Sequence, residues 1–362
     1  MARAYVVPYV GAALRRPDAV ALLTLVAVAC AGPAERDQAR RASAPSAFSR
    51  EHVTMGSSLQ VTIWTADEHG ASSASDAVFA EFDRLDRLLS VWKEGSDVLR
   101  LNAAAGREPV TVSPETIEVL TLARQVGDWT GGKFDVTFGA LSGLWKFDQD
   151  QDNVIPPRAA VQARLRDVDY TALHIDATHH TAFLRRAGMR AHLGGIGKGY
   201  GVDRGVAILR GRGFNDFMIQ SGGDMFVSGR RGDRAWRLGI RDPRGPADRS
   251  FATLELANGT FSTSGDYERF FMKDGRRYHH ILDPDVGEPA RGCRSVTIVA
   301  DRAALADALS TGVFVLGPEQ GMALIERLPD VEGVIVSSDN QVLVSSGLCG
   351  KLTLIAQPTD AP

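Results

Sequence analysis

The sequence predicts an α+β fold in which antiparallel sheets pack against helices, and three observations support this prediction. Hydrophobic residues make up 44% of the 362 residues and charged residues 23%, as in folded globular proteins rather than disordered or fibrous ones. Helix and strand patterns occur in separate runs, without the regular repeat of a doubly wound sheet. Between residues 214 and 264, short strand patterns follow one another with turn residues between them, which is typical of antiparallel sheets.

The first 50 residues are expected to lie outside the folded domain. Three arginines precede an uncharged apolar run at residues 19–30, as in a secretory signal, and this run is too short to cross a bilayer core of about 30 Å. A buried core helix is the alternative, but polar low-complexity sequence follows at once. Residues 27–30, Ala-Val-Ala-Cys, resemble a bacterial lipobox. We therefore expect a signal peptide with lipobox at 1–30, a lipid anchor on Cys30 at the periplasmic face of a bacterial membrane, and a flexible tether at 31–50.

The folded domain is expected to span residues 51–350, followed by a C-terminal tail at 351–362. Apolar residues at helical spacing, a Ser113-Pro114 start and Pro156-Pro157 indicate helices, and alternating residues indicate strands. The expected helices cover residues 75–92, 114–130, 156–168, 200–210, 302–315 and 318–327. The expected strands cover residues 59–65, 171–176, 181–187, 214–220, 224–228, 235–241, 251–256, 260–264 and 295–300, with hairpins at 270–278 and 332–345.

The net charge and the absence of several known motifs argue against some classes of function. The 41 basic and 44 acidic residues give a net charge of −3, which argues against a nucleic-acid partner. Residues 127–133 have the spacing of a P-loop, but Phe134 stands where a magnesium-binding hydroxyl is needed. The sequence has no G-x-G-x-x-G, G-x-S-x-G or H-E-x-x-H motif, so dinucleotide dehydrogenases, α/β-hydrolases and zincins lose their support. Residues 258–260 match a glycosylation sequon, but Asn-Gly between two strand patterns favours a hairpin turn.

The cysteines limit the kinds of metal site. If Cys30 is lipidated, only Cys293 and Cys349 remain, which is too few for a cluster of cysteine ligands. Whether these two cysteines form a disulfide stays open, because the sequence does not give the distance between their Cα atoms.

Three polar segments are candidates for a functional site. Residues 193–203 combine five glycines with Lys198 before a helix, which suits either an anion site or a tight strand-to-helix turn. Residues 262–268 and 279–284 bring hydroxyls, carboxylates and His280 to a predicted hairpin. Asp307, Ser310 and Thr311 share one helix face and offer oxygen ligands to Mg²⁺ or Ca²⁺, although such a face is also common as a solvated stripe.

Seven sequence motifs, which follow one another along the chain in the order of a known family, carry a resemblance to that family. The sequence resembles the ApbE family of FAD:protein FMN transferases, once described as thiamine-biosynthesis lipoproteins. This resemblance implies an ApbE-like, T-fold-related arrangement of antiparallel sheets with packed helices. The motifs are MGS (55–57), GGKFDVTFGALSGLWKF (131–147), LGGIGKGYGVDRG (193–205), SGGDMFVSG (221–229), TSGDYERF (263–270), HHILDP (279–284) and ADALSTGVFVLG (306–317).

The resemblance also implies site residues. His280 matches the histidine associated with catalysis in the family. Metal ligation is implied at Asp307 and Thr311, at a main-chain oxygen of Gly195, and in some members at the position of Ser310. Contacts with FAD are implied at Met55, Trp92, Lys133, Phe134, Asp135, His192, Lys198 and Ile281. His192 replaces an aspartate found in many members, and Ser310 replaces a carboxylate found in some.

The implied activity is the transfer of the FMN moiety of FAD to a Ser or Thr hydroxyl of an exported or membrane-bound flavoprotein, with Mg²⁺ as the cofactor and AMP as the leaving group. Such phosphoryl transfer depends mainly on positioning and charge neutralisation. Two alternatives remain, which are hydrolysis of the FAD diphosphate to FMN and AMP, and a non-catalytic flavin-binding lipoprotein.

Overall fold

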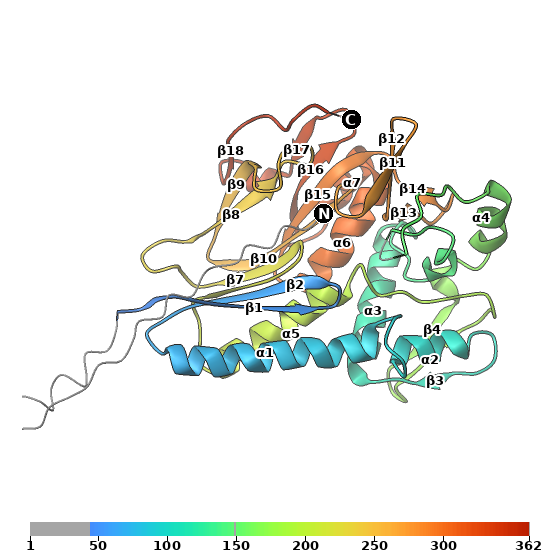
Figure 1. The fold of residues 1–362 in the computed structure, drawn as a ribbon, viewed down its shortest axis with the longest axis horizontal. Helices are drawn as coiled ribbons and strands as arrows, with labels where there is room; N and C mark the ends of the chain where they lie inside the picture. The colour runs from blue at the N-terminus through green and yellow to red at the C-terminus, as the bar shows by residue number, and fades with distance from the viewer. Residues whose placement is uncertain (1–43, 148–149, 362) are drawn as a thin grey trace, which may run out of the picture. The chain divides into compact units, whose positions relative to one another are not determined.

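A long antiparallel sheet organises the computed structural model, which describes residues 44–147 and 150–361 (Figure 1). The predicted signal peptide, Cys30 and the tether up to residue 43 lie outside the described residues. The eight strands of this sheet run in the order β1-β2-β6-β7-β10-β15-β16-β17. Their bounds are Ser46–Thr54, Ser57–Thr65, Phe217–Ser221, Asp224–Ser228, Asn258–Gly265, Cys293–Ala300, Glu332–Ser337 and Val342–Val344.

Seven α-helices occur within the described ranges, and four of them, α1, α5, α6 and α7, contact strands of this sheet. None of the helices there combines the length and the apolarity needed to cross a bilayer. In chain order they are α1 (Glu68–Leu89), α2 (Asp97–Ala103), α3 (Pro114–Trp129), α4 (Arg158–Leu165), α5 (Gly197–Gly211), α6 (Ala303–Leu316) and α7 (Pro318–Arg327).

Smaller sheets complete the domain. One has the order β18-β9-β8, with bounds Leu352–Leu354, Ser250–Leu256 and Trp236–Arg241. A second has the order β3-β5-β4, with bounds Val110–Thr111, Thr181–Leu184 and Leu173–Asp176. Two short pairs follow, β11 (Phe270–Lys273) with β12 (Arg276–His279), and β13 (Leu282–Asp283) with β14 (Glu288–Pro289).

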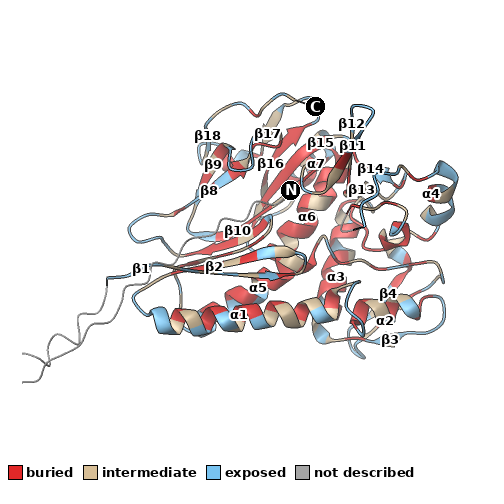
Figure 2. Cartoon of the chain, viewed as in Figure 1, coloured by how far each residue is buried: buried red, intermediate tan, exposed pale blue. Residues whose placement is uncertain are grey.

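Alternation along the strands separates two layers of core on the long sheet. Ile219 of β6 and Val296 of β15 face the helices, whereas Val227 of β7 and Val334 of β16 pack against the β18-β9-β8 sheet. This alternation is what an antiparallel sheet covered on both faces requires. Figure 2 shows the resulting pattern, with buried residues along the sheet and exposed residues on the outer sides of α1 and α4. The predicted α+β class is confirmed.

Helices α5 and α6 cross in close contact because α5 carries a glycine at the crossing. A methyl group added at Gly199 would lie 2.3 Å from the carbonyl oxygen of Ala303 and 2.8 Å from Cβ of Asp307. The main-chain N–H of Gly199 donates to Oδ2 of Asp307 at 3.0 Å. The glycine therefore allows the contact that holds a predicted metal ligand in place.

Replacing this glycine tests the close packing. We expect Gly199→Ala to lower the free energy of unfolding by about 1–3 kcal/mol, as for other overpacked cores. Thermal and urea unfolding would measure the change. Gly211→Ala is the matched control, because Gly211 ends the same helix and an added methyl group there has no atom within 4 Å. Equal stability of the two variants would contradict a tight crossing.

Several predicted boundaries differ from the structure. The first helix begins at Glu68 after an Asp67 cap, and Ser75 lies inside it, fully buried, with its hydroxyl donating to the carbonyl of Ala71. The Asn258-Gly259 pair is not a hairpin turn. It starts β10, which belongs to a different sheet from β9, and the φ of +140° at Gly259 is a conformation that L-residues with side chains rarely adopt.

The two ends of the predicted domain also differ. Residues 46–50 were expected in the tether, but they form the first half of β1, which pairs with β2 along its whole length. Residues 352–354 were expected in the tail, but they form β18, which pairs with β9. Beyond β18, the Thr359 N–H and hydroxyl donate to the buried carboxylate of Asp242. Both ends of the described chain are thus part of the folded domain.

Candidate functional site

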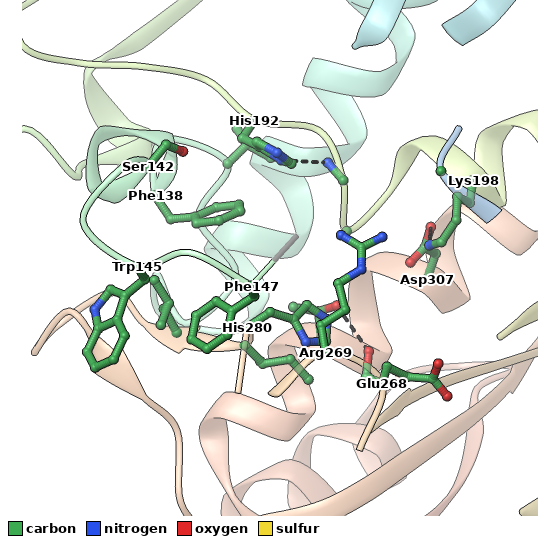
Figure 3. A pocket seen from close by; sticks show the side chains of 18 of the residues that line it. Phe138, Ser142, Trp145, Phe147, His192, Lys198, Glu268, Arg269, His280 and Asp307 are labelled. Atoms are coloured by element: carbon green, nitrogen blue, oxygen red, sulfur yellow. Dashed lines mark hydrogen bonds and ion pairs between the residues drawn. The ribbon is translucent and has the colours of Figure 1, made fainter. Parts of the chain in front are cut away.

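A cavity of about 460 Å³ lies where the α5–α6 crossing meets the β6–β7 turn, the end of β10 and the loop at residues 133–147. One end of it is polar, with Lys198, Asp224, Arg269 and Asp307. The other end is apolar and holds Phe138, Trp145 and Phe147 (Figure 3), and Leu141 and Ile281 also line the cavity. A cavity of this volume that joins a charged end to an aromatic end suits a ligand with both phosphates and ring systems.

Helix α5 brings one cation to the polar end. It starts at Gly197 after Ile196, without a side-chain cap. Lys198 follows, and its Nζ lies 2.7 Å from Oδ2 of Asp224 and 3.6 Å from Oδ2 of Asp307. Asp224 reaches this point because the two-residue Gly222-Gly223 turn ends directly before it.

Oxygen donors collect beside Asp307 on α6. The hydroxyls of Ser264 and Thr311 are 3.2 Å apart, and a methyl group added at Gly195 would lie 3.4 Å from Oγ1 of Thr311. Carboxylate, hydroxyl and carbonyl oxygens of this kind suit Mg²⁺, which is commonly held by one or two carboxylates together with waters and substrate phosphates. In the described residues no group of three or more His, Cys, Asp or Glu side chains is suited to a metal. The donors at this point are one carboxylate, hydroxyls and main-chain oxygens, so a divalent ion held here would take its remaining ligands from water and substrate phosphates.

Burial shapes the charges at this end. Burial and the neighbouring Asp224 raise the pKa of Asp307 to about 7, although Lys198 opposes this shift. Burial alone would lower the pKa of Lys198, but Asp224 and Asp307 more than offset it and raise that pKa. Lys198 is therefore protonated at neutral pH, and its charge is directed at two carboxylates of the protein.

His280 lines the cavity from the segment that follows β12. Its main-chain N–H donates to the carbonyl of Arg269 at 3.1 Å, and its Nδ1 is buried with no hydrogen-bond partner among residues 44–147 and 150–361. Burial, followed by the charge of Arg269, lowers the pKa of His280 to about 3. The ring is therefore neutral at physiological pH and has a nitrogen able to accept a proton or a hydrogen bond.

An aromatic stack forms the floor of the apolar end. The rings of Trp145 and Phe147 are stacked at 5.8 Å, and Tyr278 and Phe271 continue the stack outside the cavity lining. The indole N–H of Trp145 donates to the carbonyl of Gly287 at 2.8 Å, which fixes the ring. A fixed flat surface of this type suits a planar aromatic ring of a ligand.

The comparisons with known proteins decide the family. The sequence model of the ApbE family matches residues 55–335. The chain belongs to the ApbE family. An FAD:protein FMN transferase of Treponema pallidum is 33% identical to the ApbE chain, covering 85% of this chain and 89% of that protein. One of Klebsiella pneumoniae is 32% identical, covering 83% and 92%.

Solved structures show the same fold. The ApbE protein of Thermotoga maritima has a TM-score of 0.78 and 31% identity, covering 84% of the ApbE chain and 99% of its own. The flavin transferase ApbE of Vibrio cholerae has a TM-score of 0.76 and 27% identity, covering 85% and 99%. The predicted ApbE-like fold is therefore confirmed.

Most of the predicted site residues come together at the cavity of the ApbE chain. Those that line it are Trp92, Lys133, Phe134, Asp135, His192, Gly195, Lys198, His280, Ile281, Asp307 and Thr311. Their roles toward FAD or a metal stay predictions. Trp92 lies beyond the end of α1 and is 71% exposed, so it stands at the rim. Lys133 is held by Asp283 and Asp285, each at 2.8 Å.

Met55 and Ser310 do not line the cavity. Met55 is half-buried between two core clusters, and only the next two residues of its turn reach the cavity. Ser310 is buried, and its hydroxyl donates to the carbonyl of Asp307 at 2.9 Å and contacts Ser264 Oγ at 2.8 Å. In this arrangement, Ser310 positions Ser264 instead of facing the cavity.

Asp135 and His192 have local partners. The Asp135 carboxylate accepts hydrogen bonds from Thr137 and from the N–H of Tyr170, so it ties the loop at 133–137 to a neighbouring segment. The His192 Nδ1 accepts from the N–H of Gly194 at 3.1 Å, and its ring packs on Phe138. A carboxylate at this position would be able to accept the same N–H, which gives a physical reason why histidine is tolerated here.

Sequence reasoning missed the roles of several lining residues. Five residues that line the cavity belong to the family motifs, but no role was predicted for them from the sequence: Asp224, Ser264, Arg269, Trp145 and Phe147. For Asp224 the signal was the Gly-Gly turn directly before an acidic residue. The open question about the cysteines is also answered, since Cys293 and Cys349 are both free thiols.

The neutral histidines predict a pH dependence of stability. Burial lowers the pKa of His279 to about 4, below the value of about 6.5 for an unfolded chain. Between these values the unfolded chain binds more protons than the folded one, so stability is complete above pH 6.5 and is lost as pH falls. We expect His279 alone to cost about 2 kcal/mol between pH 7 and pH 5.

Urea unfolding at the two pH values would measure this loss. His279→Gln is the matched variant, because glutamine can keep the 2.8 Å hydrogen bond to the Ala290 carbonyl without titrating. The pH-dependent loss should shrink by about 2 kcal/mol in this variant. An unchanged loss would show that His279 is not buried as a neutral ring.

Proposed function

We propose that this ApbE-family protein transfers the FMN moiety of FAD to a Ser or Thr hydroxyl of an acceptor flavoprotein and releases AMP. The observation that carries the proposal is the cavity itself, in which charged and hydroxyl side chains at one end meet a fixed aromatic surface at the other. FAD has a diphosphate between two ring systems, so its chemistry matches both ends. The relatives that share the family carry the name of this activity.

The charge of the cavity supports a divalent cation. Five acidic side chains line it, against three basic ones: Asp135, Asp150, Asp224, Glu268 and Asp307, against Lys133, Lys198 and Arg269. An anionic diphosphate would meet an excess of negative charge there. Mg²⁺ held by Asp307, Thr311 and Gly195 would neutralise phosphate charge and polarise the phosphorus–oxygen bonds.

The reaction then needs positioning and one proton acceptor. In the proposed step, the acceptor hydroxyl oxygen bonds to the FMN phosphorus, and the bond from that phosphorus to the bridging oxygen breaks. AMP leaves with the bonding electron pair, and the hydroxyl proton passes to the neutral ring of His280. Lys198 holds the carboxylates of Asp224 and Asp307 in place through its ion pairs, and the apolar lining excludes water around the rings.

Product analysis tests the proposal. The chain lacking residues 1–30 would be incubated with FAD, Mg²⁺ and exported flavoprotein domains. Mass spectrometry would then look for the addition of one FMN to a Ser or Thr, with an equal amount of AMP. Free FMN and AMP with unmodified acceptor would point to diphosphate hydrolysis instead. FAD binding without AMP would point to a flavin carrier.

The location is part of the proposal. We propose export, lipidation at Cys30 and a periplasmic site at a bacterial membrane, from the signal-like run and the lipobox-like residues before that cysteine. A flavoprotein acceptor at the same surface would then be within reach. Cells producing the full chain and a Cys30→Ser variant would be fractionated. Equal recovery of both in the membrane fraction would contradict the anchor.

A further inference from the structure

The charge of Lys198, a predicted FAD contact, is directed at carboxylates of the protein. Lys198 lies 2.7 Å from Asp224 and 3.6 Å from Asp307, so its charge is shared with two carboxylates of the protein. A diphosphate entering the polar end adds further negative charge. A second protein cation near the phosphates would offset part of that charge in addition to a divalent ion.

Arg269 is placed to supply that cation. It lines the cavity, and Figure 3 shows its side chain extending into the space between His192 and the Lys198–Asp307 pair. Its Nη2 lies 3.9 Å from the point where a methyl group at Gly56 would stand, so the guanidinium also reaches the turn at residues 55–57. The side chain thus spans the polar end.

The backbone fixes the direction of this side chain. The carbonyl of Arg269 accepts the N–H of His280 at 3.1 Å, and the next residue, Phe270, pairs with His279 in the β11–β12 hairpin. Arg269 is therefore anchored beside His280. A group that binds the phosphates there would hold the reacting phosphorus close to the proposed proton acceptor.

Neighbouring carboxylates on the same segment are held by other arginines. Asp266 is buried and forms a bidentate pair with Arg244, with contacts of 2.6 and 2.7 Å. Glu268 lies 3.4 Å from Arg241. Asp266 and Glu268 of this segment are thus each held by an arginine from β8 or the loop after it, and Glu268 and Arg269 both line the cavity.

We propose that Arg269 binds the diphosphate of FAD and stabilises the charge on the departing AMP phosphate. This inference rests on FAD as the substrate of the proposed function. The planar guanidinium can donate two parallel hydrogen bonds to phosphate oxygens, which the ammonium of Lys198 cannot do.

Binding measurements separate this role from a structural one. Titration calorimetry with Mg²⁺ would compare FAD, ADP and riboflavin, because ADP has the diphosphate without the flavin and riboflavin has the flavin without phosphate. We expect Arg269→Gln to weaken FAD and ADP by about ten- to a hundredfold, as for the loss of a charged hydrogen bond, and to leave riboflavin unchanged. Arg269→Lys should lose less, because it keeps the charge without the planar fork.

The control is Arg276→Gln, which removes the same charge from an exposed position in the β11–β12 hairpin. It should bind all three ligands as the wild type does. Unchanged ADP and FAD affinity in Arg269→Gln, or an equal loss for riboflavin, would overturn the assignment. A wild-type protein that binds FAD but leaves the acceptor unmodified would contradict the proposed function and leave this comparison intact.

Discussion

Asp307→Asn should reduce Mg²⁺-dependent FMN transfer by at least about a thousandfold, which is the order expected when a charge-stabilising group at a transferring phosphate is lost. Asp307 supplies the one carboxylate on the α6 face that also carries Thr311, and its Oδ2 accepts the N–H of Gly199. Asparagine keeps an acceptor for that N–H but loses the negative charge. The measurement is the initial rate of FMN attachment to an acceptor domain at saturating FAD, over a range of Mg²⁺ concentrations.

Asp301→Asn is the control for this variant, because Asp301 is exposed just before α6 and does not line the cavity. It should keep wild-type rates and the wild-type Mg²⁺ dependence. Thermal unfolding of both variants shows whether the fold is kept. Wild-type transfer by a folded Asp307→Asn protein would refute the metal assignment.

His280→Ala should slow FMN transfer by about 10²–10⁴-fold, the range that general-base catalysis contributes, while FAD affinity changes little. The expectation follows from a half-buried ring that is neutral at physiological pH, since desolvation lowers the pKa of His280 to about 3. Single-turnover rates and FAD titrations on the same protein would separate chemistry from binding.

The pH profile adds a second readout. In the free protein His280 is neutral above about pH 3, so its titration should not lower kcat/KM between pH 7 and pH 6. Any decline in kcat/KM over this range should therefore be the same in the wild type and in His280→Ala. His179→Ala is the control, since His179 is an exposed histidine in the β4–β5 turn. A loss of FAD binding equal to the loss of rate would contradict a role in proton transfer.

The sequence predicted much of the site because chemistry-bearing residues occur in compact motifs. Asp307 and Thr311 are four residues apart on one helix, and Gly195 and Lys198 lie together at the start of another. Spacing within one element is visible in the sequence. The resemblance to the ApbE family then related these motifs to FAD, and the family is confirmed.

Residues that depend on contacts between distant segments were not predictable in the same way. Asp224 lies opposite Ser262 because β7 and β10 pair in one register, and the sequence does not state that register. Ser310 turns out to contact Ser264, which comes from a strand 46 residues earlier. Arg269 reaches the cavity only because the hairpin that follows it anchors its backbone beside His280.

The starts of β1 and α1 were not predicted because their residues are mostly polar or small. Residues 46–50 contain a single large apolar side chain, so they resemble a tether, yet Arg50 pairs with Asp76 of α1 at 2.6 Å and the strand covers the edge of β2. Ser75 resembled a helix cap because it precedes the clear apolar spacing, but the helix extends two turns further back over small residues. Polar or small segments that gain order from tertiary contacts give weak sequence signals.

The central claim is that the FAD diphosphate and a divalent ion meet between Asp307 on α6 and the glycine turn before α5. A crystal grown with FAD and Mn²⁺, in place of Mg²⁺, tests it through anomalous diffraction. We expect one manganese peak at about 2.1–2.2 Å from oxygens of Asp307 and Thr311, with the diphosphate beside it. A flavin nucleotide bound away from this helix, with no peak at Asp307, would contradict the account.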